Sequence, residues 1–173
     1  FKRLYGIFHE TRATATMQGH FRRNAGRGDA KIEERSYMKA IMLAAGVGSR
    51  LGAGDRLPKV LLTFAGRTLL ERHVAILKEA GLASLTLGVG YEAERIAAEI
   101  ARLNAQDFVR FLPNPDYRKG SITTLWALKH AVLAGGPVLL MDGDVLYDRR
   151  LIARLLASPH ENCFLLDRDV EAG

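Results

Sequence analysis

A single cysteine, Cys163, occurs among the 173 residues of the chain. One thiol cannot form a disulfide within the chain, and Cys163 lies in an apolar run, so we expect a buried structural thiol and a reducing, cytoplasmic location. No apolar run approaches the ~20 residues that a helix needs to cross a bilayer, so no membrane span is expected. The five histidines lack metal-ligand spacing, and we expect them on the surface.

Positive charge is in excess, but it is not gathered on one part of the folded chain. The net charge is +6. Residues 1–37 hold eight of the 25 Lys and Arg residues and four of the 19 acidic residues, so residues 38–173 keep a net charge of only +2. A nucleic-acid surface would concentrate its charge on the folded domain. We therefore expect no nucleic-acid partner.

Residues 1–37 show neither helical nor strand periodicity, and they contain no unbroken apolar segment of the kind that a secretory signal needs. We expect them to be a disordered extension outside the domain. Met38 directly precedes the first expected strand. The expected domain therefore comprises residues 38–173.

Residues 38–173 alternate strand-like runs with helical patterns. We expect strands at 40–45, 84–89, 109–112, 138–141 and 162–166, and helices at 69–80, 92–103, 122–133 and 149–157. Thr68 and Glu71 have the spacing of a helix-capping box at the start of the first helix. The alternation predicts an α/β fold, a Rossmann-like three-layer sandwich with a mostly parallel sheet.

Two glycines, Gly46 and Gly48, directly follow the first expected strand. Glycine lets the backbone turn sharply and present several N–H groups to a polyanion. Arg50 adds a planar guanidinium, and Lys59, just after a proline, adds a mobile ammonium. This segment, residues 46–59, is called the phosphate loop. The predicted nucleotide-binding residues here are Leu43, Ala44, Ala45, Gly46, Gly48 and Ser49, and the predicted catalytic residues are Arg50 and Lys59.

Two commoner glycine loops do not fit. A dinucleotide-binding fingerprint needs glycine where Leu51 stands and an acidic residue about 20 positions on, which is absent. A Walker loop needs Gly-Lys-Ser/Thr, whereas Gly52 precedes Ala53. The two glycines alone are also compatible with a plain turn that ends a strand. Arg50 and Lys59 favour the phosphate loop over that turn.

The pattern L-A-A-G-x-G-x-R followed by P-K-x-L-L resembles the signature of the nucleotidyltransferase superfamily (NTP_transferase, MobA-like), which activates sugar and alcohol phosphates. Later segments resemble its phosphocholine cytidylyltransferase-like branch: N-P-D-Y at 114–117, T-L-W-A-L at 124–128 and L-L-M-D-G-D at 139–144. The resemblance runs from Met38 to the end of the chain. Because the family continues beyond this point, we expect a C-terminally truncated fold. The sequence does not decide whether such a fragment is active.

Asp142 and Asp144 directly follow an apolar run, so two carboxylates leave a buried strand together. In parallel sheets ligands bind beyond the carboxyl ends of the strands, and Mg²⁺ takes one or two carboxylates plus substrate phosphates. The resemblance implies that Asp144 holds the metal, with Asp142 as the weaker candidate, and that a second metal carboxylate belongs to a later segment. An Asp-Gly turn is the alternative.

The loop before the expected helix at 122–133 supplies further candidates. Ser121 and Thr124 are predicted nucleotide-binding residues, because a hydroxyl there can cap a helix whose N-terminus accepts anions. By the resemblance, Asn114 and Tyr117 are substrate-side residues, although a plain turn at the intervening proline is equally open. Helical spacing places Trp126 in the core rather than in an aromatic box for a quaternary ammonium.

The resemblance implies transfer of CMP from CTP to a small alcohol phosphate such as phosphocholine, with release of pyrophosphate and with Mg²⁺ as cofactor. One alternative is a sugar-1-phosphate or inositol-phosphate nucleotidyltransferase. Another is a non-catalytic module that senses nucleotides, although such a module would not need to keep Asp144. The sequence indicates no particular oligomeric state.

Overall fold

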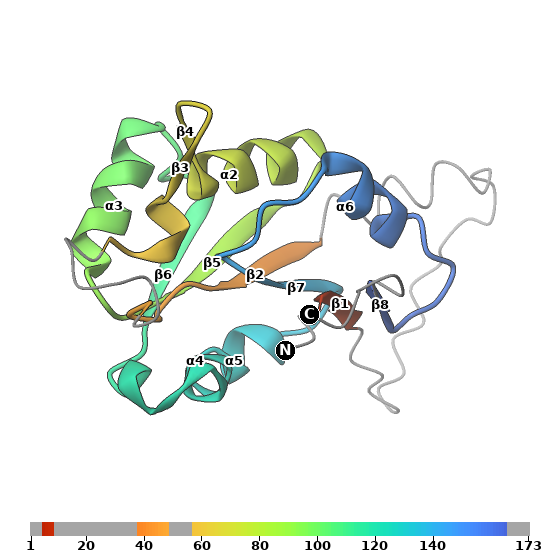
Figure 1. Ribbon diagram of the computed structural model, residues 1–173. Helices are drawn as coiled ribbons and strands as arrows, with labels where there is room; N and C mark the ends of the chain where they lie inside the picture. The colour runs from red at the N-terminus through yellow and green to blue at the C-terminus, as the bar shows by residue number, and fades with distance from the viewer. Residues whose placement is uncertain (1–4, 9–37, 49–56, 166–173) are drawn as a thin grey trace, which may run out of the picture.

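The computed structural model describes residues 5–8, 38–48 and 57–165. In them a six-stranded sheet lies between two layers of helices (Figure 1). Helices α2 (Leu69–Glu79), α3 (Ala93–Arg102) and α6 (Arg149–Leu156) cover one face, and α4 (Ser121–Ala127) and α5 (Lys129–Val132) cover the other. The expected α/β three-layer fold is confirmed. In the described part of the chain, no helix has the length and apolar character needed to cross a membrane.

The centre of the sheet is parallel. It consists of β2 (Lys39–Leu43), β5 (Ser84–Val89), β6 (Val109–Pro113) and β7 (Val138–Asp142), in the order β6-β5-β2-β7. Leu43 lies opposite Gly88 of β5 and Asp142 of β7. The carboxyl ends of these strands therefore lie side by side, along one end of the sheet. Most expected elements are present with small shifts at their ends, while the helix expected at 122–133 is divided at Leu128.

Strand β1 (Tyr5–Phe8) departs from the expectation for the start of the chain. It is antiparallel to both of its neighbours, β7 and β8 (Cys163–Leu165), with Ile7 opposite Leu139 and Cys163. The expectation that residues 1–37 stay outside the domain is therefore wrong for these four residues. Their Tyr-Gly-Ile-Phe run contains three good strand formers, and the edge of β7 offers unpaired backbone groups. For the rest of 1–37, outside the described residues, the expectation stays a prediction.

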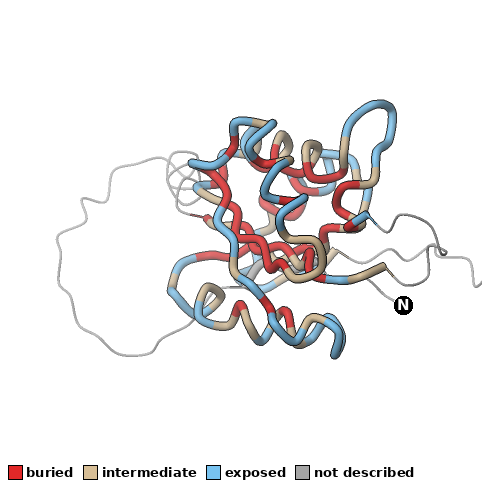
Figure 2. Tube along the Cα trace, turned by 90° about the vertical axis from the view of Figure 1, so that its left-hand side faces the viewer, coloured by how far each residue is buried: buried red, intermediate tan, exposed pale blue. Residues whose placement is uncertain are grey.

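Successive side chains of β2 point to opposite faces of the sheet, and each face is covered by a separate cluster of core residues. Ala40 and Met42 belong to the larger cluster beneath α2, α3 and α6. Ile41, between them, belongs to a smaller cluster with Leu128 and Val138 on the side of α4 and α5. Figure 2 shows the buried residues concentrated on the strands and on the inner sides of the helices. Both faces of β2 are therefore covered, as is typical of the central strand of a parallel sheet.

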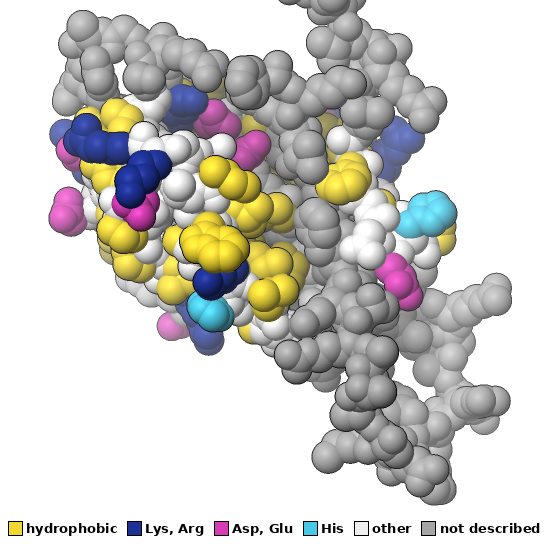
Figure 3. Space-filling model, turned by 90° about the horizontal axis from the view of Figure 1, so that it is seen from below, with side chains coloured by type: hydrophobic (Ala, Val, Ile, Leu, Met, Phe, Trp, Pro, Cys, Tyr) yellow, Lys and Arg dark blue, Asp and Glu magenta, His cyan; other side chains and the backbone are white. Residues whose placement is uncertain are grey.

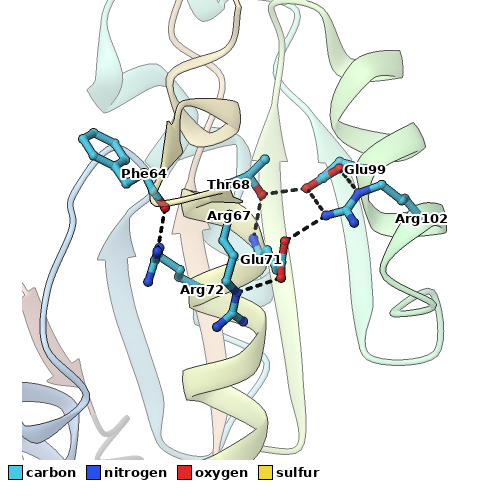
Figure 4. A network of polar contacts seen from close by, with 7 residues as sticks. All are labelled: Phe64, Arg67, Thr68, Glu71, Arg72, Glu99 and Arg102. Atoms are coloured by element: carbon cyan, nitrogen blue, oxygen red, sulfur yellow. Dashed lines mark hydrogen bonds and ion pairs between the residues drawn. The ribbon is translucent and has the colours of Figure 1, made fainter.

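A network of polar groups joins α2 to α3 (Figure 4). Thr68 is the N-cap of α2, as expected, and its Oγ1 accepts from the N–H of Glu71 at 3.0 Å and donates to Glu99 at 2.6 Å. Arg102 donates to Glu71 at 2.9 Å and to Glu99 at 2.7 Å. The hydrogen bond from Arg67 lowers the pKa of Glu71, and that from Arg102 lowers the pKa of Glu99. The network fixes the start of α2, whose inner side faces the site.

The outer side of α4 and α5 carries exposed apolar side chains, so the expectation that Trp126 lies in the core is wrong. Trp126 and Ile122 are each 69% exposed, and Leu133 is 59% exposed. The inner side is formed by Thr124 and Leu128, which are buried. Figure 3, which views the molecule from the side of these helices, shows hydrophobic side chains gathered there. The Lys129 ammonium lies 4.0 Å from the centroid of the Trp126 ring, a cation–π contact.

Helix α4 lies close against β5 because Gly88 has no side chain. A Cβ at Gly88 would lie 2.6 Å from Cγ2 of Thr124 and 2.8 Å from Cδ1 of Leu128. We expect Gly88→Ala to lower the free energy of unfolding by about 1–3 kcal/mol, because the added methyl overpacks this contact. Urea denaturation measures the change. Gly46→Ala is the matched control for stability, since no atom of the described residues lies within 4 Å of a Cβ built there. An equal loss in both variants would contradict the close contact at Gly88.

Removal of residues 1–37 tests whether β1 contributes to the domain. We expect the deletion to lower Tm by about 5 °C, the shift that a loss of about 2 kcal/mol produces in a domain of this size, because β7 and β8 lose their backbone pairing with β1. Calorimetry of the deletion variant and the unmodified chain measures the shift. An unchanged Tm would support the sequence-based expectation instead.

Candidate active site

The phosphate loop starts at the carboxyl end of β2, and the residues just before it are tied to neighbouring segments. The Ala44 N–H donates to the Gly88 carbonyl at 2.9 Å, and the Ala45 carbonyl accepts from the Tyr91 N–H at 3.2 Å. Within the described ranges, no acceptor is found for the N–H groups of Gly46 and Gly48. These two amides are therefore among those that a phosphate could meet.

Three of the residues predicted to bind the nucleotide thus have backbone groups that hold the loop in place: Leu43, Ala44 and Ala45. Their contact with a nucleotide stays a prediction. Ser49 and Arg50 lie outside the described residues, so their roles in binding and catalysis stay predictions. Gly48 has a φ of 69°, a left-handed conformation that favours glycine over other residues.

Lys59 and Asp144, two predicted site residues 85 positions apart, are in direct contact. The ammonium Nζ of Lys59 donates to Oδ2 of Asp144 at 2.9 Å, and the side chains are 35% and 28% exposed. Lys59 opens the short 3₁₀ helix η1 (Lys59–Leu61), whose other two residues, Val60 and Leu61, are buried. The buried pair anchors η1 beside the sheet. The ammonium is therefore directed towards the end of β7, where solvent can still reach the ion pair.

The turn at Asp142–Asp144 packs against the end of β2. The Gly143 N–H donates to the Leu43 carbonyl at 3.0 Å. A Cβ at Gly143 would lie 3.2 Å from that oxygen and 3.3 Å from Sδ of Met42. This tight fit fixes the path of the backbone between the two carboxylates. Asp142 stays opposite Leu43, and Asp144 reaches Lys59.

The donor set of Asp142 and Asp144 fits Mg²⁺ bound together with a triphosphate. The part of the chain that the structure describes holds no group of three or more His, Cys, Asp or Glu side chains able to hold a metal ion. Mg²⁺ commonly takes one or two carboxylates and completes its octahedral shell with substrate phosphates and water. The two carboxylates match that incomplete set of hard oxygen ligands.

His73 is buried, so the expectation that all histidines lie on the surface is wrong for this one. It is 2% exposed and lies on α2, with Nε2 3.2 Å from the Gly143 carbonyl oxygen and its ring centroid 5.1 Å from that of Tyr147. Burial lowers the pKa of His73 to about 4. The spacing of His73 along the helix indicates this burial, because His73 shares the buried side of α2 with Leu70, Val74 and Leu77.

Asn114 organises the loop that follows β6. Its Nδ2 donates to Oγ1 of Thr123 at 3.1 Å and to Oγ1 of Thr124 at 2.9 Å, while its Oδ1 accepts from the Asp116 N–H at 3.0 Å. Asn114 and Thr124 are each only 3% exposed. Both side chains thus hold the start of α4. Their predicted contacts with the acceptor and the nucleotide stay predictions.

The start of α4 differs from the expected cap. The N-cap is Gly120, which has no side chain to cap the helix, and Thr123 Oγ1 donates to the Gly120 carbonyl at 2.7 Å. The expectation that a Ser or Thr hydroxyl caps this helix is therefore wrong. Ser121 is exposed, so its hydroxyl can reach a ligand. Tyr117 is half-buried and packs over Gly90, where a Cβ would lie 2.6 Å from that of Tyr117.

The lowered pKa of His73 predicts a pH-dependent stability. Between pH 6.5 and 4 the unfolded chain binds a proton at this residue and the folded chain does not, so the folded state loses stability as the pH falls. We expect the unmodified protein to lose about 2 kcal/mol more free energy of unfolding than His73→Leu between pH 7 and pH 5. Urea titrations at the two pH values measure this. Equal losses would mean that His73 keeps an ordinary pKa.

The comparisons with known proteins agree with this geometry. Residues 40–170 match the MobA-like NTP transferase domain. The CMP-5'-(3-aminopropyl)phosphonate synthase of Streptomyces rubellomurinus is 30% identical over 133 residues, which are 76% of this chain and 21% of that protein. The N-acetylmuramate alpha-1-phosphate uridylyltransferase of Neisseria meningitidis is 33% identical over 115 residues, 64% of this chain and 48% of that protein.

A solved structure gives the same result. The CTP:phosphocholine cytidylyltransferase LicC from Streptococcus pneumoniae superposes with a TM-score of 0.56 at 28% identity, over 65% of this chain and 48% of that one. The chain thus spans between about a fifth and a half of the length of these relatives. The match of residues 40–170 covers most of the chain, including Lys59 and Asp144, and it shows that the chain belongs to the family of MobA-like NTP transferase domains.

Proposed function

We propose that the protein transfers a nucleoside monophosphate from a nucleoside triphosphate to a small phosphate monoester and releases pyrophosphate. The observation that carries this proposal is the contact of Lys59 with Asp144 beside the glycines of the phosphate loop. An ammonium and a carboxylate thus lie at the carboxyl ends of the strands, where the phosphate loop also starts. Those are the groups that phosphoryl-type transfer needs, since its catalysis rests on positioning and on charge stabilisation.

In the proposed reaction an oxygen of the acceptor phosphate attacks the α-phosphorus. The bond from that phosphorus to the oxygen bridging to the β-phosphate breaks, and pyrophosphate leaves with the bonding electrons. No nucleophile from the protein is needed. Negative charge grows on the leaving oxygen, and the N–H groups of Gly46 and Gly48 stabilise it, while the Lys59 ammonium stabilises the charge of the α-phosphate and the incoming monoester. Arg50 is proposed to hold the leaving phosphates.

Asp144, with Asp142, is proposed to hold Mg²⁺, which when bound would offset the charge of the triphosphate. Asp144 also keeps the Lys59 side chain at the edge of the sheet. Without this contact the long lysine side chain would sample many rotamers and would rarely point at the phosphates. The ion pair therefore orders a catalytic group before the substrate binds.

For the donor and acceptor we propose CTP and a small alcohol phosphate such as phosphocholine. Support comes from LicC, a CTP:phosphocholine cytidylyltransferase, and from the relative that is a CMP-phosphonate synthase. The uridylyltransferase relative makes a sugar 1-phosphate the principal rival acceptor. We also propose a cytoplasmic location, because Cys163 is free and needs no oxidising compartment.

Substitutions at the ion pair test the catalytic roles. We expect Lys59→Ala to lower kcat by about 10²–10³-fold with a smaller change in KM for the triphosphate, because Lys59 acts on charge that develops in the transition state. Asp144→Asn should lower kcat at least as much, and Asp142→Ala less. Pyrophosphate release from CTP and phosphocholine measures each rate. Lys78→Ala is the matched control, since Lys78 lies near Phe108, which directly precedes the first residue of β6 and so lies at the amino ends of the strands.

A substrate screen decides between the proposals. Four nucleoside triphosphates are combined with phosphocholine, a sugar 1-phosphate and an inositol phosphate, and pyrophosphate release is followed. Turnover only with the sugar or the inositol phosphate would contradict the proposed acceptor but keep the reaction. Nucleotide binding without release from any pair would identify a non-catalytic nucleotide-sensing module and overturn the proposal.

A further inference from the structure

We propose that His73 is a positioning residue, which sets the place of the Asp144 carboxylate by donating a hydrogen bond from Nε2–H to the Gly143 carbonyl oxygen. The observation behind this is the 3.2 Å separation of these two atoms beneath the turn. The consequence for catalysis rests on the proposed function, in which Asp144 holds the metal and orders Lys59. The consequence for the backbone of the turn does not depend on the proposed function.

The hydrogen bond acts on the peptide group that carries Asp144. The Gly143 carbonyl oxygen belongs to the peptide unit whose nitrogen is that of Asp144, so a rotation of this unit would swing the Asp144 side chain away from Lys59. Glycine resists such rotation less than any other residue. The preceding peptide unit is already held, because the Gly143 N–H donates to the Leu43 carbonyl at 3.0 Å. His73 holds the second unit from the opposite side.

The imidazole nitrogens have distinct states here. A carbonyl oxygen can only accept, so Nε2 must carry the hydrogen. Nδ1 of His73 is buried and finds no hydrogen-bond partner among the described residues. The low pKa of the ring means that it carries one proton at neutral pH, which therefore resides on Nε2. An unpartnered buried nitrogen costs free energy, so an apolar residue would suit the packing of α2 better than this histidine does.

The His73 ring is held by its contact with Tyr147 and by its place on α2. Tyr147 lies against it with an interplanar angle of 35°. His73 belongs to the buried side of α2, whose first turn is fixed by the Thr68 cap. The donor is thus mounted on a rigid helix, while the acceptor lies in a turn. Loss of a partner bonded directly to a metal ligand costs about 10–100-fold in metal affinity or activity, and His73 acts one step further away, through the peptide group that carries Asp144.

Two substitutions separate positioning from packing. His73→Leu has a similar size and removes the donor. His73→Gln keeps an N–H donor at about the reach of Nε2. His130→Leu is the control, because His130 is exposed on α5. Hydrogen–deuterium exchange of residues 142–146 is measured in the unliganded chain, and exchange in β5 reports global opening. We then measure kcat, KM and the Mg²⁺ concentration for half-maximal turnover.

We expect His73→Leu to speed local exchange at residues 142–146 by about 10-fold or more relative to β5, while His73→Gln and His130→Leu stay within about 2-fold. His73→Leu should also lower kcat by about 10-fold or more and raise the Mg²⁺ requirement, with KM for the triphosphate little changed, and His73→Gln should restore both. Faster exchange in His73→Leu without turnover in any variant would support the positioning and overturn only the proposed function.

Two results would overturn the inference. One is unchanged local exchange in His73→Leu, because Asp144 would then keep its place without the hydrogen bond. The other is equal damage in His73→Leu and His73→Gln, because the shape of the ring rather than its N–H group would then matter.

Discussion

The site depends on the parallel pairing of β2 with β7, which sets Leu43 beside Asp142. Because both strands run in the same direction, the chain leaves them at the same edge of the sheet, and the phosphate loop and the Asp142–Asp144 turn start side by side. The Gly143 N–H bonded to the Leu43 carbonyl extends this pairing by one step beyond the strands. The bonds that bring together residues so far apart in the sequence are backbone bonds. The ion pair of Lys59 and Asp144 is therefore not needed to hold the two strands together.

Helices and parallel strands could be predicted because each has a local signal: an apolar run, a cap such as Thr68, or a glycine that ends the pattern. The errors have physical causes. Periodicity shows which residues share a side of a helix but not which side meets the sheet. Thr124 faces the sheet, while Trp126, which the spacing predicts in the core, is exposed. His73 has the spacing of the buried Leu70 and Leu77, so its position predicts burial where its residue type alone predicts a place on the surface. Strand β1 has only four residues, and its pairing is with distant strands.

At the site, the sequence motifs located Lys59 and Asp144, but only the pairing of the strands brings their charged atoms to 2.9 Å. A motif also cannot distinguish a residue that touches the ligand from one that holds the loop. Asn114 illustrates this, since its amide makes hydrogen bonds to Thr123, Thr124 and Asp116, all within the protein. His73 belongs to no motif, and its relation to Gly143 follows from packing alone.

The position of β1 also constrains how the chain can fold during synthesis. Of the described strands, β1 is made first and its two neighbours, β7 and β8, are made last, so β1 cannot join the sheet until nearly the whole described chain has left the ribosome. Until then the β7 edge of the sheet stays open, and an open edge is where another chain can pair. Contacts between such distant segments also close slowly. Among the described strands, this pairing therefore joins the first to the last two, and a nascent chain stalled before β8 would expose this edge to its neighbours on a polysome.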